Sequence, residues 1–273
     1  MGNQMGNIVE KFNLNGRVAI VTGGAGLLGS EFCRTLAEVG AAVVVADLAE
    51  GPARIVAESL PHAFSFPLNV TDPAACTALV EKTLKEFGRL DVLVNSAALD
   101  PKVSSEGAMR DASSFESYSL KAWRAALEVN LTGMFLATQA AVKPMKAQGK
   151  GSIVNICSIY GLYAPDQRIY ERPGQPPQYK PVDYSVTKAG VLGFTRYLAA
   201  YYAGTEIRVN SLSPGGVYDD QDEQFVQNYA YRAIMGRMAH KDEMNGALLF
   251  LASDASSYMT GGNLVVDGGW TAW

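Results

Sequence analysis

The chain has 273 residues, of which 48% are hydrophobic and 18% are charged, and its net charge is −4. This length and composition suffice for one α/β domain with a full core, and the acidic balance excludes a basic field for nucleic acid. No apolar run approaches the roughly 18 residues of a membrane span, and Met1–Asn7 lacks the features of a signal peptide. Three widely spaced cysteines and only two histidines indicate a cytoplasmic protein with free thiols and no metal site.

Short β-branched runs alternate with helical patterns along the chain. Because this alternation is typical of βαβ units, it predicts one single-domain, Rossmann-type α/β fold over residues 1–273. The fold has a doubly wound parallel sheet of about seven strands with helices on both faces. Residues 1–13 are expected to be a loose segment, and 100–119 and 164–183 are expected to be loops. Strands are expected at 17–21, 42–46, 62–68, 90–95, 152–158, 207–212 and 262–266, and helices at 27–39, 71–87, 120–146 and 184–202.

A glycine-rich segment, Thr22-Gly23-Gly24-Ala25-Gly26-Leu27-Leu28-Gly29, follows the first expected strand. Such a turn lets the backbone approach a pyrophosphate, which the amides and dipole of the next helix stabilise. Asp47 ends the second strand, where a carboxylate binds ribose hydroxyls and repels a 2′-phosphate, and Leu48 follows it without an adjacent arginine. The pattern predicts a site for NAD rather than NADP. A turn residue at a strand end is the alternative for Asp47.

Tyr184 and Lys188 lie four residues apart at the start of an apolar helical stretch, so their side chains share one face. A nearby cation favours phenolate and lowers the tyrosine pKa from about 10 toward neutrality, which suits a general acid or base. Ser158 ends the fifth strand and would donate a hydrogen bond to the reacting oxygen. A surface Tyr–Lys pair and a strand-end cap at Ser158 are the structural alternatives.

These motifs, in this order, resemble the short-chain dehydrogenase/reductase family in its compact single-domain branch, over residues 14–269. The resemblance also rests on Asn95-Ser96-Ala97-Ala98, Ser213-Pro214-Gly215-Gly216-Val217 and Asp267-Gly268-Gly269. It implies a catalytic set of Asn130, Ser158, Tyr184 and Lys188, with Asn130 holding a water beside Lys188. It further implies cofactor contacts from Gly23, Gly26, Leu27, Leu28, Gly29, Asp47, Leu48, Asn69, Val70, Asn95, Ala97, Tyr184, Lys188, Pro214, Gly215 and Val217.

The long helices carry apolar residues beyond what one sheet face needs, and the family pairs such helices between subunits. We therefore expect a homotetramer, or at least a dimer, although a thicker core is the alternative. The residues concerned are Ala137, Ala140, Ala141, Leu192, Phe194 and Leu198.

The spacing of 26 positions between Ser158 and Tyr184 is larger than in most relatives, which implies an insertion within residues 164–183. Loops at the carboxyl ends of parallel strands bind ligands, and this polar, aromatic loop suits a hydroxyl-rich or anionic substrate. The predicted substrate contacts are Tyr160, Arg168, Arg172 and Tyr218. A loop that contacts another subunit is the alternative.

The prediction is an NAD(H)-dependent oxidoreductase that interconverts a secondary alcohol and a ketone of a sugar, sugar acid or polyol. A weaker resemblance to oxidoreductases of bacterial nonulosonic-acid and other sugar pathways points to the same substrates. One alternative is an epimerase or dehydratase of a nucleotide sugar, because Gly26 stands where the sugar-nucleotide branch has its glycine. A dehydrogenase of an apolar or aromatic alcohol is another. A non-enzymatic NAD-binding protein is disfavoured because all four catalytic positions are filled.

Trp270 and Trp273 have three possible roles: they close the substrate site, they form an interface, or they belong to a disordered tail.

Overall fold

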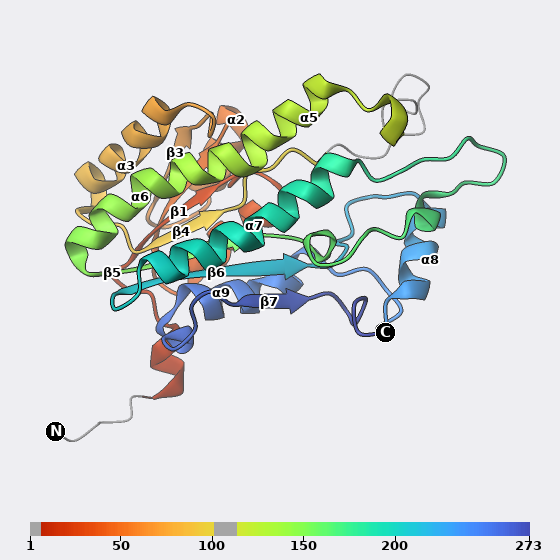
Figure 1. Ribbon diagram of the computed structural model, residues 1–273. Coiled ribbons are helices and arrows are strands. Elements are labelled where there is room, and N and C mark those ends of the chain that lie inside the picture. Colours follow the sequence, from red (N-terminus) through yellow and green to blue (C-terminus); the bar gives the residue numbers. More distant parts are fainter. Residues whose placement is uncertain (1–6, 101–113) are drawn as a thin grey trace.

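The computed structural model describes residues 7–100 and 114–273. Within these residues, one parallel sheet has the strand order β3-β2-β1-β4-β5-β6-β7 (Figure 1). This confirms the predicted Rossmann-type α/β fold. The strand order reverses between β1 and β4, and ligands of doubly wound sheets bind at such a point, beyond the carboxyl ends of the strands. The strands are β1 Val18–Thr22, β2 Ala42–Asp47, β3 Ala63–Pro67, β4 Val92–Asn95, β5 Lys150–Ile156, β6 Glu206–Pro214 and β7 Asn263–Val266.

Neighbouring residues of a strand point to opposite faces of the sheet, and each face has its own core, covered by helices. Ala19 and Val21 pack into the core beneath α1 (Leu27–Glu38), α2 (Glu50–Glu58) and α9 (Asn245–Ala252). Ile20, Val44 and Leu93 pack into the core beneath α3 (Pro73–Phe87) and α6 (Met134–Gln148). Helix α7 (Val182–Tyr201) lies beside these two helices. In Figure 1, α8 (Glu223–Arg232) and the start of α5 (Leu120–Leu127) lie on the side toward which the strands point.

The predicted strands are confirmed with small shifts of their ends, whereas three helices were not predicted. The sequence of α2 contains Gly51-Pro52, which is typical of a turn, and α8 is polar on most of its surface. The short apolar run of α9 has no polar face that would identify it as a helix. Tertiary packing therefore decides these segments.

Two further expectations differ from the structure. The helix expected at 120–146 is split by a π-helical turn, Glu128–Gly133, between α5 and α6. In segment 1–13, residues 8–12 form a 3-10 helix whose first turn is capped by the Asn7 side chain, and none of them is buried. Residues 1–6 lie outside the described residues, as does most of the loop expected at 100–119. No helix in the described ranges has the length and hydropathy needed to cross a bilayer.

Candidate active site

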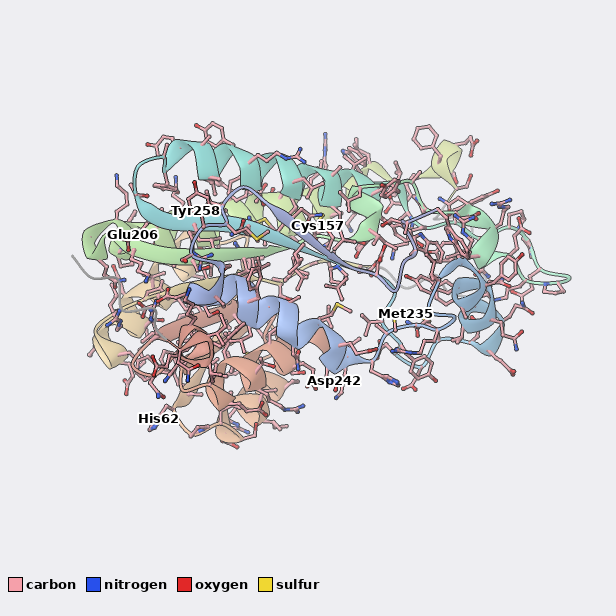
Figure 2. The ribbon with its side chains drawn as sticks, turned by 90° about the horizontal axis from the view of Figure 1, so that it is seen from below. His62, Cys157, Glu206, Met235, Asp242 and Tyr258 are labelled. Carbon is pink, nitrogen blue, oxygen red and sulfur yellow. The ribbon has the colours of Figure 1, made fainter. Side chains whose placement is uncertain are left out.

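A cavity of about 600 Å³ opens at the carboxyl end of the sheet. The glycine turn, the end of β5, the insertion and the segment after β6 form its wall. Figure 2 shows Glu206, at the start of β6, and Met235, close to α8, at opposite sides of the molecule. Because β5 and β6 run in parallel, residues that follow them meet on the Met235 side. The cavity therefore lies where the topology predicts a ligand site.

The glycine turn folds tightly against its own helix and the strand beside it. Gly23 has a φ of 66°, and a Cβ there would lie 2.8 Å from the Ala97 backbone. A Cβ at Gly29 would lie 2.0 Å from the Gly23 carbonyl oxygen. Side chains at these positions would clash with the protein's own backbone, so the two glycines let the turn pack tightly against α1 and the segment after β4. Ten of the predicted cofactor residues line the cavity: Gly23, Gly26, Leu27, Leu28, Gly29, Tyr184, Lys188, Pro214, Gly215 and Val217.

Asp47 is held beside this turn by two backbone amides. Its carboxylate accepts hydrogen bonds from the amides of Ala25, at 3.0 Å, and Ala49, at 2.9 Å. Asp47 is thus a turn residue at a strand end, which was the alternative interpretation. Its carboxylate is also a fixed negative charge next to the glycine turn. Leu48 beside it is exposed.

Four other predicted cofactor residues do not belong to the cavity lining. Asn95 is buried and donates to Thr138 Oγ1 and to Asn155 Oδ1, both at 2.9 Å, so its side chain ties β4 to β5 and α6. The Asn69 side chain accepts from Thr71 in a local turn. Val70 packs against Gly133 of the π-helical turn, and the backbone of Ala97 contacts Gly23. Asn95, Val70 and Ala97 thus contact neighbouring elements of the fold, whereas Asn69 is exposed after β3.

Ser158, Tyr184 and Lys188 converge on the cavity although they come from separate elements. Ser158 is the N-cap of a 3-10 turn, Ile159–Gly161, and its side chain accepts the Tyr160 amide at 3.2 Å. It also shares a hydrogen bond with Tyr184. The buried Lys188 Nζ donates to the Ile156 carbonyl at 2.9 Å and lies 5.6 Å from the centre of the Tyr184 ring.

The electrostatics of this group differ from the expectation in one respect. Burial raises the pKa of Tyr184, the negative charge of Asp100 raises it further, and the hydrogen bond with Ser158 lowers it. Burial also lowers the pKa of Lys188. The prediction that Lys188 brings the Tyr184 pKa toward neutrality is therefore wrong for the chain by itself, because desolvation of the phenolate dominates.

Asn130 lies in the π-helical turn and uses its amide to join two segments. Its Nδ2 donates to the Leu99 carbonyl and to Thr187 Oγ1, each at 3.1 Å, and its Oδ1 accepts the Leu99 amide at 2.7 Å. The side chain therefore positions the chain after β4 against α7, one residue from Lys188. Its role in holding a water beside Lys188 stays a prediction.

The insertion is anchored at its base and along one side. The Gln167 side chain accepts the Lys180 amide at 2.8 Å and donates to the Lys180 carbonyl at 3.4 Å, which closes the loop. Arg172 donates to Asp222 at 2.6 Å and to the carbonyls of Ile169 and Glu171. These bonds hold the insertion against the start of α8.

The predicted substrate residues separate into two groups. Tyr160 and Arg172 line the cavity, although Arg172 is paired with Asp222. The Arg168 side chain is 75% exposed and forms a bidentate pair with Asp166, and Tyr218 also lies outside the cavity wall. The sequence interpretation missed Asp100, Tyr170, Lys180, Phe225 and Tyr229, which line the cavity. Lys180 precedes Tyr184 by four residues but lies before α7 begins at Val182, so helical spacing did not identify it.

Aromatic side chains form the wall opposite the glycine turn. Tyr170 and Phe225 are 5.3 Å apart between ring centres, and Tyr160 meets Tyr184 edge to face at 6.5 Å. Trp270 is buried and stacks on Tyr229 at 4.3 Å, so it supports this wall from behind. Trp273 donates its indole N–H to the Arg232 carbonyl at 3.0 Å, which fastens the end of the chain to α8. Neither tryptophan is therefore part of a disordered tail.

Cys157 packs into the core next to α7 and also borders the cavity. It is buried, and its thiol lies 3.1 Å from the Lys188 carbonyl. Figure 2 shows it between Glu206 and Met235, inside the molecule.

Comparison with known proteins agrees with this architecture. A family model described as enoyl-(acyl carrier protein) reductase matches residues 24–271. Over 266 residues the chain is 38% identical to cis-4-hydroxycyclohexanecarboxylate dehydrogenase of Sinomonas cyclohexanicum, covering 94% of this chain and 97% of that one.

Two solved structures superpose along almost the entire chain. A gluconate 5-dehydrogenase of Burkholderia cenocepacia, in complex with NADP and tartrate, has a TM-score of 0.84 and 30% identity, covering 98% of this chain and 100% of that one. A short-chain dehydrogenase of Leptospira borgpetersenii with bound NAD⁺ has a TM-score of 0.83 and 32% identity, covering 99% and 98%. These matches support an oxidoreductase that acts on CH–OH groups with a nicotinamide cofactor. The chain belongs to the short-chain dehydrogenase/reductase family.

Proposed function

We propose that the protein is an NAD(H)-dependent dehydrogenase that interconverts a secondary alcohol and its ketone, with Tyr184 as the proton carrier. The observation that carries this proposal is the convergence of Ser158, Tyr184 and Lys188 on the cavity that the glycine turn also lines. A nicotinamide cofactor, when bound, would supply or accept the hydride. Within the cavity, Tyr184 would exchange the hydroxyl proton, and Ser158 would donate a hydrogen bond to the substrate oxygen where negative charge develops. Lys188 would hold the ribose of the cofactor.

The protonation state of Tyr184 assigns it a role in each direction. Because burial raises its pKa, the phenol is neutral at physiological pH and is ready to donate a proton to a ketone oxygen. For alcohol oxidation the phenol must first lose its proton, and the Ser158 hydrogen bond favours the phenolate that results.

The choice of NAD rests on Asp47. Its carboxylate is fixed at the end of β2 by the amides of Ala25 and Ala49, so it cannot easily move away from a 2′-phosphate. The similar structures hold NADP in one case and NAD⁺ in the other, and the fixed carboxylate is the feature that favours NAD here.

The substrate we propose first is a secondary alcohol on a compact ring. Flat apolar ring faces are well matched by the aromatic wall formed by Tyr160, Tyr170, Phe225 and Tyr229. The relative named for a hydroxycyclohexanecarboxylate supports this choice. A sugar acid or polyol is the second candidate, because Asp100, Arg172 and Lys180 add polar groups to the same cavity. A relative named for gluconate supports that reading. An epimerase or dehydratase has less support, since these relatives are named as dehydrogenases.

We also propose that the protein works in the cytoplasm as a homotetramer or dimer. The small residues expected to form the interface, Ala137, Ala140 and Ala141, are instead buried within the subunit. The outer surfaces of α6 and α7 carry other apolar side chains, all substantially exposed: Phe135, Val186, Tyr197 and Tyr201. A surface of this kind fits subunit association.

A direct assay tests the proposed reaction. The purified protein is mixed with NAD or NADP and a panel of cyclic alcohols, hydroxy acids, sugar acids, polyols and steroids, and formation of reduced cofactor is followed. We expect turnover with NAD and a cyclic or hydroxylated acid, with release of both ketone and NADH. Product isomers formed without net NADH would contradict the dehydrogenase assignment and favour an epimerase.

A further inference from the structure

Lys180 brings a second lysine ammonium group next to the proposed proton carrier. Its Nζ lies 4.1 Å from the centre of the Tyr184 ring, closer than the 5.6 Å of Lys188. The Lys180 side chain is only 11% exposed and lines the cavity. A cation shielded from water in this way interacts strongly with a charge placed in the same cavity.

Toward the residues that the structure describes, the ammonium group of Lys180 has hydrogen-bonding capacity beyond its partner Asp100. It forms an ion pair with Asp100, which follows β4, and this bond uses one of its three donors. The Lys180 backbone is held independently by the Gln167 side chain. The ammonium can therefore gain or exchange an anionic partner without disturbing the base of the insertion.

The two arginines of the insertion are poorly placed for the same task. Arg172 is committed to Asp222 and to two backbone carbonyls, which fasten the insertion to α8. Arg168 projects into solvent and pairs with Asp166. The remaining carboxylates of the cavity, Asp219 and Asp220, come from the segment after β6, whereas Lys180 lies against α7.

We propose that Lys180 binds a carboxylate of the substrate, so that the enzyme selects secondary alcohols that carry a carboxylate a short spacer away from the hydroxyl-bearing carbon. This inference rests on the proposed function, because it assigns the hydroxyl group to Tyr184. Lys180 lies over the Tyr184 ring, so the carboxylate and the reacting carbon must be close, and the aromatic wall would hold the spacer between them. Ring hydroxy acids and sugar acids both belong to this class.

Binding of probes without a hydroxyl group tests this assignment separately from turnover. The NADH-loaded protein is titrated by calorimetry with cyclohexanecarboxylate, cyclohexanecarboxamide and cyclohexylamine. We expect the carboxylate to bind at least about tenfold more tightly than the amide, because a charge-assisted hydrogen bond is stronger than a neutral one. Lys180→Met should remove this preference, Lys180→Arg should restore part of it, and Arg168→Met, an exposed cation of the same loop, should leave it unchanged.

Removing the competing carboxylate provides a test in the opposite direction. Asp100→Asn frees Lys180, so the carboxylate probe should bind more tightly to this variant than to the unmutated protein. Weaker binding in Asp100→Asn would overturn the proposal. A carboxylate preference that survives in Lys180→Met, no preference in the unmutated protein, or tighter binding of the amine would overturn it as well.

Failure of the proposed function is recognised independently. If no alcohol in the panel reduces NAD, the proposed function fails, while the carboxylate preference of the probes is still measured. If turnover is normal but the preference does not depend on Lys180, only the assignment of Lys180 fails.

Discussion

Gly161 contacts Lys188 so closely that a Cβ at position 161 would lie 2.7 Å from the Lys188 carbonyl oxygen. This contact joins the turn after β5 to α7 and so determines how Ser158 faces Tyr184. The insertion leaves after this turn and returns at α7, which explains how 26 positions of sequence separate two side chains that share a hydrogen bond.

Gly161→Ala should therefore lower kcat by about tenfold or more, because a misplaced reacting group loses much of its effectiveness. It should also lower Tm, since the methyl group has no room in this contact. Steady-state kinetics and thermal unfolding measure the two effects. Gly193→Ala, in α7 and with open space at its Cβ position, is the matched control and should change neither. Equal kinetics in the two variants would contradict the importance of this contact.

Tyr184→Phe should remove most of kcat and leave cofactor binding nearly intact, because only the hydroxyl group is lost. Turnover above a tenth of the unmutated level would refute Tyr184 as the proton carrier.

Lys188→Ala should lower kcat and also weaken cofactor binding, measured by NADH titration. An unchanged cofactor Kd in that variant would remove the ribose contact.

Asp47→Ala should narrow the preference for NAD over NADP, mainly by weakening NAD, because the carboxylate both binds ribose hydroxyls and repels a 2′-phosphate. Values of kcat/KM for both cofactors measure this. Since Asp47 also accepts two backbone amides, Asp47→Asn serves as the comparison that preserves more of the turn. Equal use of both cofactors by the unmutated protein would contradict the prediction.

The pH dependence of alcohol oxidation should follow the Tyr184 phenol. Its pKa is raised, so the phenolate that accepts the hydroxyl proton forms only as the pH rises, and kcat/KM for oxidation should increase with pH. Asp100→Asn removes a charge that raises this pKa, so the rising limb should move to lower pH. Ser158→Ala removes a bond that lowers it, so the limb should move to higher pH. The distant Asp242→Asn should leave the profile unchanged, and shifts in the reverse directions would exclude Tyr184 as its origin.

Tyr197→Glu should dissociate the oligomer or weaken it strongly. The Tyr197 side chain is 65% exposed on α7 and stacks with Tyr201, so a buried charge at this surface would oppose association. Light scattering measures the mass of each species. The exposed Lys85→Glu, on α3, is the control, and a monomeric unmutated protein at micromolar concentration would refute the assembly.

The sequence by itself determined the parallel sheet and the identity of the Tyr184–Lys188 pair. Both are local patterns: β-branched runs, a glycine turn after a strand, and a spacing of one helical turn are all encoded by neighbouring residues. The helix α2 was missed for the same reason, because Gly51-Pro52 locally favours a turn and only packing against the sheet makes it helical.

Only the tertiary structure decided which side chains reach the cavity and what their charges do. Arg168 and Arg172 looked equivalent in the sequence, yet one pairs with Asp166 in solvent and the other fastens the insertion to Asp222. Lys180 lines the cavity, because the closed loop places its ammonium group over the Tyr184 ring. Burial raises the pKa of Tyr184, and the atoms that bury it come from several elements. A spacing of four residues cannot reveal desolvation by segments that are distant in the sequence.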